Sequence, residues 1–338
     1  MNLHPPIDHA TLGALLRRDY GIEARSFAYR PAEWSVGGFS ITAEDGRRSY
    51  LKVQEVHPWT FAASSRDFYL PLTLELHRRA ILPHISYPLP TCDGRLWIRH
   101  GPYALILHHA IEGVTVGHQG MSDAVVSELA GLIGRLHASA VHRRLSHPLI
   151  ETFDVTFRDV LLSAVGGDNG AGFRSAALQG ALQPRAGELR AGLDRLAALK
   201  RKLHQEPPQM VVCHTDLHGD NLMRGSDGQL YILDWDNALV APREHDLFFF
   251  TSDERFSQVF APAYEAVVGS VRMSSDALRY YAYRRGLEDI ADYVVRIARG
   301  DGDDDRDRRD LADMLKILDE LQEVEATVDT IEARDLAR

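Results

Sequence analysis

The chain has few cysteines and no long apolar run. Its two cysteines, Cys92 and Cys213, are far apart in the sequence and lack the short spacing of a metal-binding pair. We therefore expect free thiols in a reducing cytoplasm. The longest apolar stretch, residues 103–107, is much shorter than the roughly 20 residues of a membrane-spanning helix. The opening residues, MNLHPPIDHA, lack the basic start and apolar core of a signal peptide. Together these absences predict a cytoplasmic protein without a membrane partner.

Acidic residues outnumber basic ones, with 48 Asp and Glu against 38 Lys and Arg, so the formal net charge is −10. This balance argues against a nucleic-acid-binding surface and mildly favours a cationic small molecule, although solubility alone would explain it equally well. The chain contains no internal repeat and no GxxxxGK[ST] pattern, which disfavours a P-loop kinase. With 45% hydrophobic and 25% charged residues over 338 positions, it has the composition of an ordinary globular protein of about two domains. We expect a monomer or a weak dimer.

The most informative stretch is VVCHTDLHGDNLMRGSDGQLYILDWD, residues 211–236. A short apolar run at residues 210–213 predicts a buried strand that ends at His214. After a Ser-Asp-Gly turn signal, a second run at residues 229–233 predicts a strand that ends at Asp234. Asp216, Asn221 and Asp234 are therefore expected on short loops at strand ends.

The spacing of these residues is typical of kinases. His214-x-Asp216-x-x-x-x-Asn221 is the pattern of a kinase catalytic loop, and an Asp at a nearby strand end provides a second metal ligand. Through these residues and the Ile232 and Asp234 strand end, the segment resembles the aminoglycoside phosphotransferase family, relatives of protein kinases. The stretches HTDLHGDNL, ILDWD and APREHDL are most similar to its spectinomycin phosphotransferase branch.

This resemblance implies an α+β fold, bilobal and protein-kinase-like. Residues 1–107 would form a small N-terminal nucleotide-binding lobe with an antiparallel sheet, and residues 108–113 would form the hinge. Residues 114–338 would form a larger, mainly helical C-terminal lobe that carries the catalytic loop and the acceptor site.

The resemblance also implies roles for individual side chains. Asp216 would face the acceptor hydroxyl, while the oxygens of Asn221 and Asp234 would hold Mg²⁺. His214 and Asp246 would support the catalytic loop from behind, Asp246 through backbone amides.

Two simpler interpretations of the loop remain open. Asp216 and Asn221 are common turn residues. His214 and His218 could also form a zinc pair, although the Glu of the usual motif is missing and Gly219 follows.

The first lobe should supply the nucleotide contacts. Residues 26–29, 39–43 and 49–53 predict strands, the last two joined by an Asp-Gly hairpin. Alternation places Lys52 on the face opposite Leu51 and Val53, and the resemblance aligns it with the family's phosphate-binding lysine. Gly37 and Gly38 fall where the family has its nucleotide-covering loop, although loop flexibility alone would explain a glycine pair.

A helix at residues 66–79 should carry the carboxylate partner of that lysine. Asp67 fits by register with the family, but it could instead cap the helix, and Glu75 is the alternative. Pro71 is tolerable only if it lies near the start of the helix. Adenine would be held by backbone groups of about His109 to Ile111. The side chains there therefore do not indicate whether the nucleotide is ATP or GTP.

The rest of the chain is predicted to be mainly helical. Predicted helices cover residues 122–137, 155–165, 187–203, 256–268, 275–284, 286–295 and 308–321, with loops at 166–171 and 300–305. Glu288, Asp289 and Asp292 lie on one of these helices, where they could bind a substrate amine or could equally form a solvated face. Asp236 and Glu244 are further candidates for substrate binding.

We therefore predict a Mg²⁺-dependent kinase that moves the γ-phosphate of ATP or GTP to a hydroxyl of a small cationic molecule. An aminoglycoside or aminocyclitol antibiotic such as spectinomycin is the expected acceptor, which implies antibiotic resistance. A metabolic kinase of choline, homoserine or a sugar would share every motif, and a nucleotide-binding pseudokinase scaffold is an alternative of another class. A protein kinase is less favoured because Trp235 and Asp236 replace its Phe-Gly pair and no Ala-Pro-Glu motif follows.

Overall fold

The computed structural model describes residues 7–31, 36–56, 62–117, 120–166, 176–299 and 304–336. Within it the chain forms two compact units. The first unit comprises Met1–Ile150, Val211–Ala241 and Ser257–Gly269, and the second comprises Glu151–Met210, Pro242–Phe256 and Ser270–Arg338. The lobe boundaries proposed from the sequence stay a prediction.

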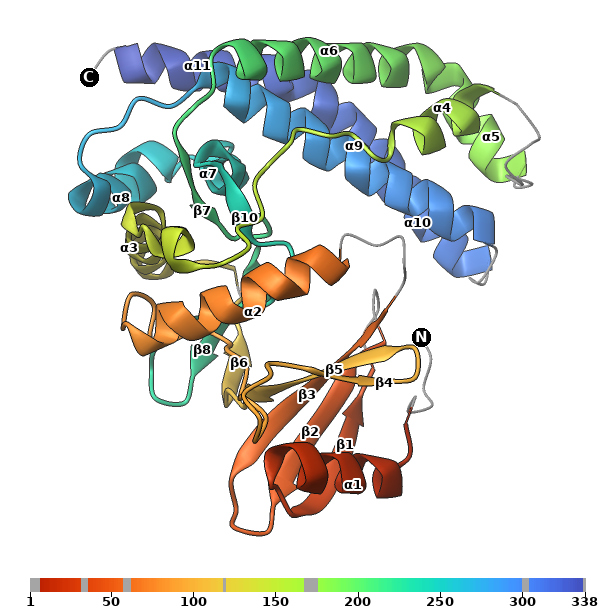
Figure 1. Ribbon diagram of the computed structural model, residues 1–338. Coiled ribbons are helices and arrows are strands. Elements are labelled where there is room, and N and C mark those ends of the chain that lie inside the picture. Colours follow the sequence, from red (N-terminus) through yellow and green to blue (C-terminus); the bar gives the residue numbers. More distant parts are fainter. Residues whose placement is uncertain are drawn as a thin grey trace. The chain divides into compact units, whose positions relative to one another are not determined.

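The first unit contains both helices and strands, and helices dominate the second (Figure 1). The strands are β1 (Ala24–Arg30), β2 (Gly38–Ala43), β3 (Arg48–Glu55), β4 (Ile98–His100), β5 (Tyr103–His109), β6 (Gly113–Thr115), β7 (Met210–Cys213), β8 (Leu222–Gly225), β9 (Leu230–Ile232) and β10 (Leu239–Pro242). The α-helices are α1 (His9–Tyr20), α2 (Ala62–Arg78), α3 (Asp123–Ala138), α4 (Arg158–Gly166), α5 (Ala176–Leu182), α6 (Ala186–Gln205), α7 (Glu244–Thr251), α8 (Ala261–Val268), α9 (Ser275–Arg299), α10 (Asp304–Glu320) and α11 (Val324–Leu336).

The first unit is built on a five-stranded antiparallel sheet with the order β1-β2-β3-β5-β4. Side chains alternate along β3, so Leu51 and Val53 are buried on one face. Helix α1 covers this face with Leu12 and Leu16, which join the same apolar cluster (Figure 1). Gly21 ends α1 in the left-handed conformation, at φ 64°, which glycine adopts without strain.

The opposite face of the sheet carries Lys52 and Gln54, and α2 lies on this side. A hydrogen bond from Arg66 of α2 to Gln54 fixes this placement. The helix begins at Ala62, earlier than the sequence predicted, so Pro71 lies well inside it. The expectation that Pro71 would fall near the start of the helix was therefore wrong.

The second unit is a packed set of helices in which α9 contacts α6, α10 and α11 (Figure 1). Leu189, Leu193 and Leu196 form a buried stripe along α6 and join the core. Helix α9 is continuous through Gly286, where the sequence predicted a break. A Cβ atom at Gly286 would lie 2.7 Å from Leu321 Cδ2, so the glycine allows close packing rather than ending the helix.

Several elements were not predicted, namely the short elements β6, β8, β10, α5 and α7 and the longer C-terminal helix α11. Most of the predicted loops at residues 166–171 and 300–305, and part of the loop before Gly37, lie outside the described residues. Throughout the described part of the chain, no helix combines the length and the apolar character needed to cross a bilayer.

Candidate active site

The predicted catalytic loop follows β7 and is anchored by a buried histidine. His214 is completely buried, and its Nε2 lies 2.7 Å from the carbonyl oxygen of Leu233. Its Nδ1 accepts a hydrogen bond from the backbone N–H of Asp216 at 3.3 Å. Nε2 must then carry the proton that is donated to Leu233. In turn, the N–H of Leu233 donates to the carbonyl of Asn221 at 2.8 Å, so the segments that carry Asp216 and Asp234 are tied together.

Both segments contain a residue in the left-handed region, where non-glycine residues are uncommon. Thr215 has φ 74° and Asp234 has φ 57°. Such conformations cost on the order of 1–3 kcal/mol each and persist only where neighbouring contacts hold them. The hydroxyl of Thr215 donates to the carbonyl of Asn237 at 3.0 Å, a further link between the two segments.

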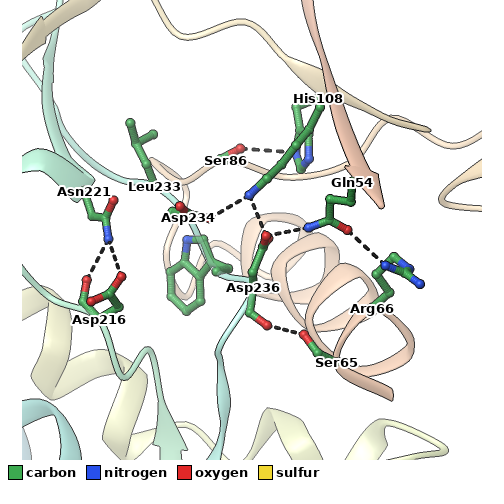
Figure 2. Close-up of polar contacts among 12 residues, drawn as sticks. Gln54, Ser65, Arg66, Ser86, His108, Asp216, Asn221, Leu233, Asp234 and Asp236 are labelled. Carbon is green, nitrogen blue, oxygen red and sulfur yellow. Dashed lines mark hydrogen bonds and ion pairs between the residues drawn. The ribbon is translucent and has the colours of Figure 1, made fainter. Parts of the chain in front are cut away.

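Asp216 and Asn221 face each other across a single 3₁₀ turn, Gly219–Asn221. The side-chain amide of Asn221 donates to the backbone carbonyl of Asp216 at 2.9 Å and to its carboxylate Oδ2 at 3.1 Å. Figure 2 shows the amide oxygen of Asn221 on the side away from Asp216. An oxygen so placed is available to a cation, while the nitrogen of the same amide holds the carboxylate of Asp216.

The sequence reasoning did not give His218 a place in this site. Its Nε2 lies 3.5 Å from Asp216 Oδ2 and 3.1 Å from Asn221 Nδ2. Its Nδ1 accepts a hydrogen bond from the backbone N–H of Asp220 at 3.3 Å. The sequence offers His218 only as a zinc partner of His214, but hydrogen bonds already engage both ring nitrogens of His214. The position of His218 only two residues after Asp216 was the sequence signal that could have identified it.

Lys52 lies between two carboxylates. Its Nζ is 2.7 Å from Asp234 Oδ1 and 2.6 Å from Asp236 Oδ2 (Figure 2). Burial of the ammonium opposes its charge, but Asp236 and Asp234 more than offset this effect and raise the pKa of Lys52 well above its ordinary value. For Asp234, burial would raise the pKa, yet Lys52 lowers it overall. The negative charge of Asp216 opposes this lowering of the Asp234 pKa to a smaller extent.

Asp236 is at the centre of a polar network that reaches α2. Gln54 donates to the carboxylate of Asp236, and the Ser65 hydroxyl donates to its backbone carbonyl (Figure 2). The buried side chain of Tyr69 lies beside it, and burial together with the negative charge of Asp236 raises the pKa of Tyr69 well above its usual range. Sequence reasoning suggested Asp236 for substrate binding. The structure instead directs its carboxylate to Lys52 and Gln54.

The predicted helix partner of Lys52 is also corrected. Asp67 is exposed on α2, and the described residues that bond the ammonium of Lys52 are Asp234 and Asp236. The alternative, Glu75, pairs with Arg79 at 2.8 Å. Neither helix carboxylate therefore contacts Lys52.

The predicted adenine and phosphate segments lie around β2 and β5. Gly37 and Gly38 precede and begin β2, and Gly38 is paired with Lys52 in the sheet register. His109 is the last residue of β5, and its N–H donates to the carbonyl of Tyr87 at 3.4 Å. Ile111 lies beyond that strand. The nucleotide-binding roles of these residues stay predictions.

The remaining candidate acids belong to the second unit. Glu244 is only 2% exposed and accepts a hydrogen bond from the Ser274 backbone N–H, which is a structural contact rather than a substrate-binding position. Asp289 pairs with Arg285 at 3.0 Å. Asp246 is fully buried in α7, and its support of the catalytic loop stays a prediction.

Two acids on α9 keep their candidate role. Glu288 has its pKa raised by burial and, to a smaller extent, by the nearby charge of Asp292, although Arg284 opposes the shift. Asp292 is exposed. Their role in binding a substrate amine stays a prediction.

The oxygens at this site suit a hard divalent cation. Asn221 offers its amide oxygen, and Asp234 offers a carboxylate with a lowered pKa, which is therefore ionised at neutral pH. Mg²⁺ takes oxygen ligands and keeps several waters, so one amide and one carboxylate are enough protein ligands when phosphate oxygens complete the sphere. The residues present fit a magnesium ion.

Comparison with known proteins identifies the class. The model of the phosphotransferase enzyme family matches residues 62–281, which is more than half of the chain. The chain therefore belongs to this family and is a phosphotransferase, as the resemblance predicted.

Solved structures of kinases share its fold. Spectinomycin phosphotransferase APH(9)-Ia, in a complex with ADP and spectinomycin, is 18% identical, with a TM-score of 0.71 over 95% of this chain and 99% of that one. An aminoglycoside phosphotransferase from Alicyclobacillus acidocaldarius is 15% identical, with a TM-score of 0.61 and coverage of 100% and 98%. Choline kinase LicA from Streptococcus pneumoniae is 14% identical, with a TM-score of 0.59 and coverage of 92% and 98%. The predicted α+β, kinase-like fold is confirmed.

Proposed function

We propose that this phosphotransferase is a Mg²⁺-dependent kinase that moves the γ-phosphate of ATP or GTP to a hydroxyl group of an aminoglycoside or aminocyclitol such as spectinomycin. One observation carries the proposal. Lys52, Asp216, Asn221 and Asp234 come from three segments of the chain, and hydrogen bonds and one ion pair join these segments. Each of the four has the chemistry that phosphoryl transfer requires.

Asp216 acts on the acceptor. Its Oδ2 is held by the amide of Asn221, and its backbone N–H is held by His214, so the carboxylate has a defined direction. An ordinary Asp has a pKa of about 3.9 and is a weak base at neutral pH. Its main contribution is therefore to orient the hydroxyl towards the phosphorus atom, and it accepts the proton late in the transfer.

Lys52, Asn221 and Asp234 act on the nucleotide. The ammonium of Lys52 binds phosphate oxygens and offsets their negative charge, which a largely buried cation does better than one in water. The oxygens of Asn221 and Asp234 would hold Mg²⁺, which when bound neutralises charge on the phosphates. Because transfer depends on positioning and electrostatics rather than on covalent chemistry, no further nucleophile is needed.

The proposed acceptor class is supported by the negative charge of the protein and by its similarity to solved kinase structures. The net charge is −10, and Glu288 and Asp292 add negative charge to α9, which favours an acceptor that carries amines. Among the structural relatives, one holds spectinomycin together with ADP. Another is a choline kinase, so a cationic metabolic alcohol is the second candidate.

A screen with γ-labelled ATP and Mg²⁺ tests the proposal. The purified protein is incubated with spectinomycin, several aminoglycosides, choline and homoserine, and labelled product is separated from ATP. The Asp216→Asn variant is the control for contaminating kinases. We expect label on an aminocyclitol or aminoglycoside with the wild type and almost none with the variant. Label on choline or homoserine alone would replace the antibiotic with a metabolic acceptor. Mg-ATP binding without transfer to any amine-bearing alcohol would favour a pseudokinase.

A further inference from the structure

The two carboxylates that contact Lys52 differ in their proposed roles, because only one of them is a candidate metal ligand. Asp234 Oδ1 and Asp236 Oδ2 both lie within 2.7 Å of the lysine Nζ. If Asp234 is a ligand of the metal, its oxygens must serve the cation as well. Its hold on Lys52 then weakens at the moment when Lys52 has to bind phosphate. Asp236 has no metal-binding role in the proposed reaction, so its contact with Lys52 can persist with nucleotide bound.

Lys52 needs such a lasting partner because it is largely buried. Its side chain is 19% exposed, and removing an ammonium from water is costly unless a carboxylate compensates. A lysine side chain also has four flexible bonds, so an unheld ammonium loses conformational entropy when it binds phosphate. A carboxylate that stays in place supplies both the compensating charge and a fixed position.

The surroundings of Asp236 give it that fixed position. Gln54 stands two residues from Lys52 on the same strand and face, and its amide nitrogen donates to Asp236 Oδ2. The amide oxygen of Gln54 accepts a hydrogen bond from Arg66 Nη1 at 3.3 Å. Arg66 is buried, with its guanidinium 5.2 Å from the ring centre of Trp97. Both ends of the Gln54 amide are therefore engaged, and Asp236 is oriented by a chain of contacts that runs back to α2.

Helix α2 thus contributes a serine hydroxyl and a guanidinium group at the place where the sequence predicted a carboxylate. Ser65 bonds the backbone carbonyl of Asp236, Arg66 holds Gln54, and the acid of this turn, Asp67, is exposed. A buried arginine in this place favours a negative group nearby. The carboxylate that matches it comes from the loop after β9.

We propose that Asp236 is the positioning residue of the nucleotide-binding lysine: through Lys52 it sets the affinity for the phosphate groups of the nucleotide, and α2 holds it in place through Gln54, Ser65 and Arg66. The inference rests on the proposed function, because it assumes that Lys52 binds nucleotide phosphates. The inference concerns nucleotide binding alone, so it can be tested without knowing the acceptor.

The test compares a nucleotide with a nucleoside. Calorimetry measures the affinity of the full-length protein for Mg·AMP-PNP and for adenosine, which has the same base and sugar but no phosphate. We expect Asp236→Asn to weaken Mg·AMP-PNP on the order of 10-fold, as for the loss of a charge-assisted hydrogen bond. Adenosine affinity should change less than about twofold, whereas general damage to the fold would weaken both ligands.

A double-mutant cycle shows whether the effect passes through Lys52. In a Lys52→Ala background, Asp236→Asn should alter Mg·AMP-PNP affinity less than about twofold, because the interaction is already absent. Asp236→Glu should recover part of the loss seen with Asn. If Asp236→Asn does not fold, Gln54→Met replaces it, with a smaller loss in the same direction that also disappears in the Lys52→Ala background. Glu44→Gln removes one exposed acid from the β2–β3 hairpin and is the charge-matched control.

Each outcome decides a different point. A wild type that does not bind Mg·AMP-PNP overturns the proposed function and this inference together. A wild type that binds, with Asp236→Asn equal to it or tighter, overturns the inference alone, since Asp236 would then only repel phosphate. An undiminished effect of Asp236→Asn in the Lys52→Ala background would also overturn it. If Asp67→Asn weakened Mg·AMP-PNP but not adenosine, and Asp236→Asn had no such effect, the partner of Lys52 would be Asp67 on α2.

Discussion

Replacing Asp216 by Asn changes one atom and leaves the loop intact. The Asn side chain keeps an oxygen that can accept the hydrogen bond now made by Asn221 Nδ2 at 3.1 Å. The backbone carbonyl of residue 216 still accepts the second bond at 2.9 Å, and His214 still binds the backbone N–H. The substitution therefore removes a negative charge and a proton acceptor from the site without removing the contacts that shape it.

The expected loss follows from those two functions. General-base assistance is worth typically about 10²–10⁴-fold in rate, equal to about 2.7–5.5 kcal/mol of activation free energy. Because the role proposed for Asp216 is mainly to orient the acceptor hydroxyl, we expect a fall in kcat of at least about 10²-fold. Nucleotide affinity should stay within about threefold, since Lys52 and Asp234 are unchanged and lose only a nearby negative charge.

The assay is steady-state transfer of labelled phosphate to the acceptor found in the screen, with calorimetry of Mg·AMP-PNP on the same preparation. Asp220→Asn is the matched control, because Asp220 lies in the same loop with its side chain 64% exposed, and it should keep turnover within about twofold. Turnover of Asp216→Asn near the wild-type value would refute the assignment of Asp216. A parallel fall in nucleotide affinity would instead indicate that the loop had collapsed.

Three further predictions concern other parts of the site and its scaffold. Asp234→Asn should reduce turnover by roughly 10²–10³-fold and abolish the increase of ATP affinity on Mg²⁺ titration; retained Mg²⁺ dependence would contradict its role. Gly38→Ala should destabilise the protein by about 1–3 kcal/mol in urea unfolding, because a Cβ there would collide with the Leu51 carbonyl and lie 2.6 Å from the Tyr50 hydroxyl oxygen. For Glu244, burial raises the pKa above its ordinary value of 4.5, against the lowering effects of Ser274 and Arg243. The protonated form is then favoured in the folded state, and its stabilisation is lost as pH rises from about 4.5 through the raised pKa. Relative to Glu244→Gln, the wild type should thus lose up to about 1.4 kcal/mol of unfolding free energy per pH unit in that window, and a flat difference between pH 4.5 and 7.5 would contradict the burial argument.

Local patterns were sufficient to find several candidate residues. Lys52 was found because side chains alternate along a strand, and this alternation persists in β3. Asp216 and Asn221 were indicated by the His-x-Asp-x-x-x-x-Asn spacing, which is typical of a kinase catalytic loop and lies within one short segment. The apolar period of α6 was equally visible, and its leucines are buried. These features depend on neighbours within a few residues, which a sequence displays directly.

Long-range contacts and close packing were not visible in the same way. Asp236 bonds Lys52 across 184 positions, and no local pattern favours it over Asp67. The continuity of α9 through Gly286 depends on the approach of Leu321 from another helix. Strands β6, β8 and β10 have only three or four residues, too few for a period to be recognised.

The connectivity of the short strands explains why the candidate catalytic residues meet. Strand β7 pairs with β10 in one small sheet, and β8 pairs with β9 in another. The chain therefore passes between these two sheets twice, once from β7 to β8 and once from β9 to β10. The first passage carries Asp216 and Asn221, and the second carries Asp234 and Asp236.

Two passages between the same pair of sheets must run close to one another, and here they are bonded at three points. These bonds are His214 to the Leu233 carbonyl, the Leu233 N–H to Asn221, and Thr215 to Asn237. The left-handed backbone at Thr215 and at Asp234 falls within these bonded passages, where strain can be compensated by contacts on both sides. The relative position of the Asp216 and Asp234 carboxylates is thus a property of sheet pairing. The sequence motif identifies the residues, but the pairing of the two sheets determines the distance between them.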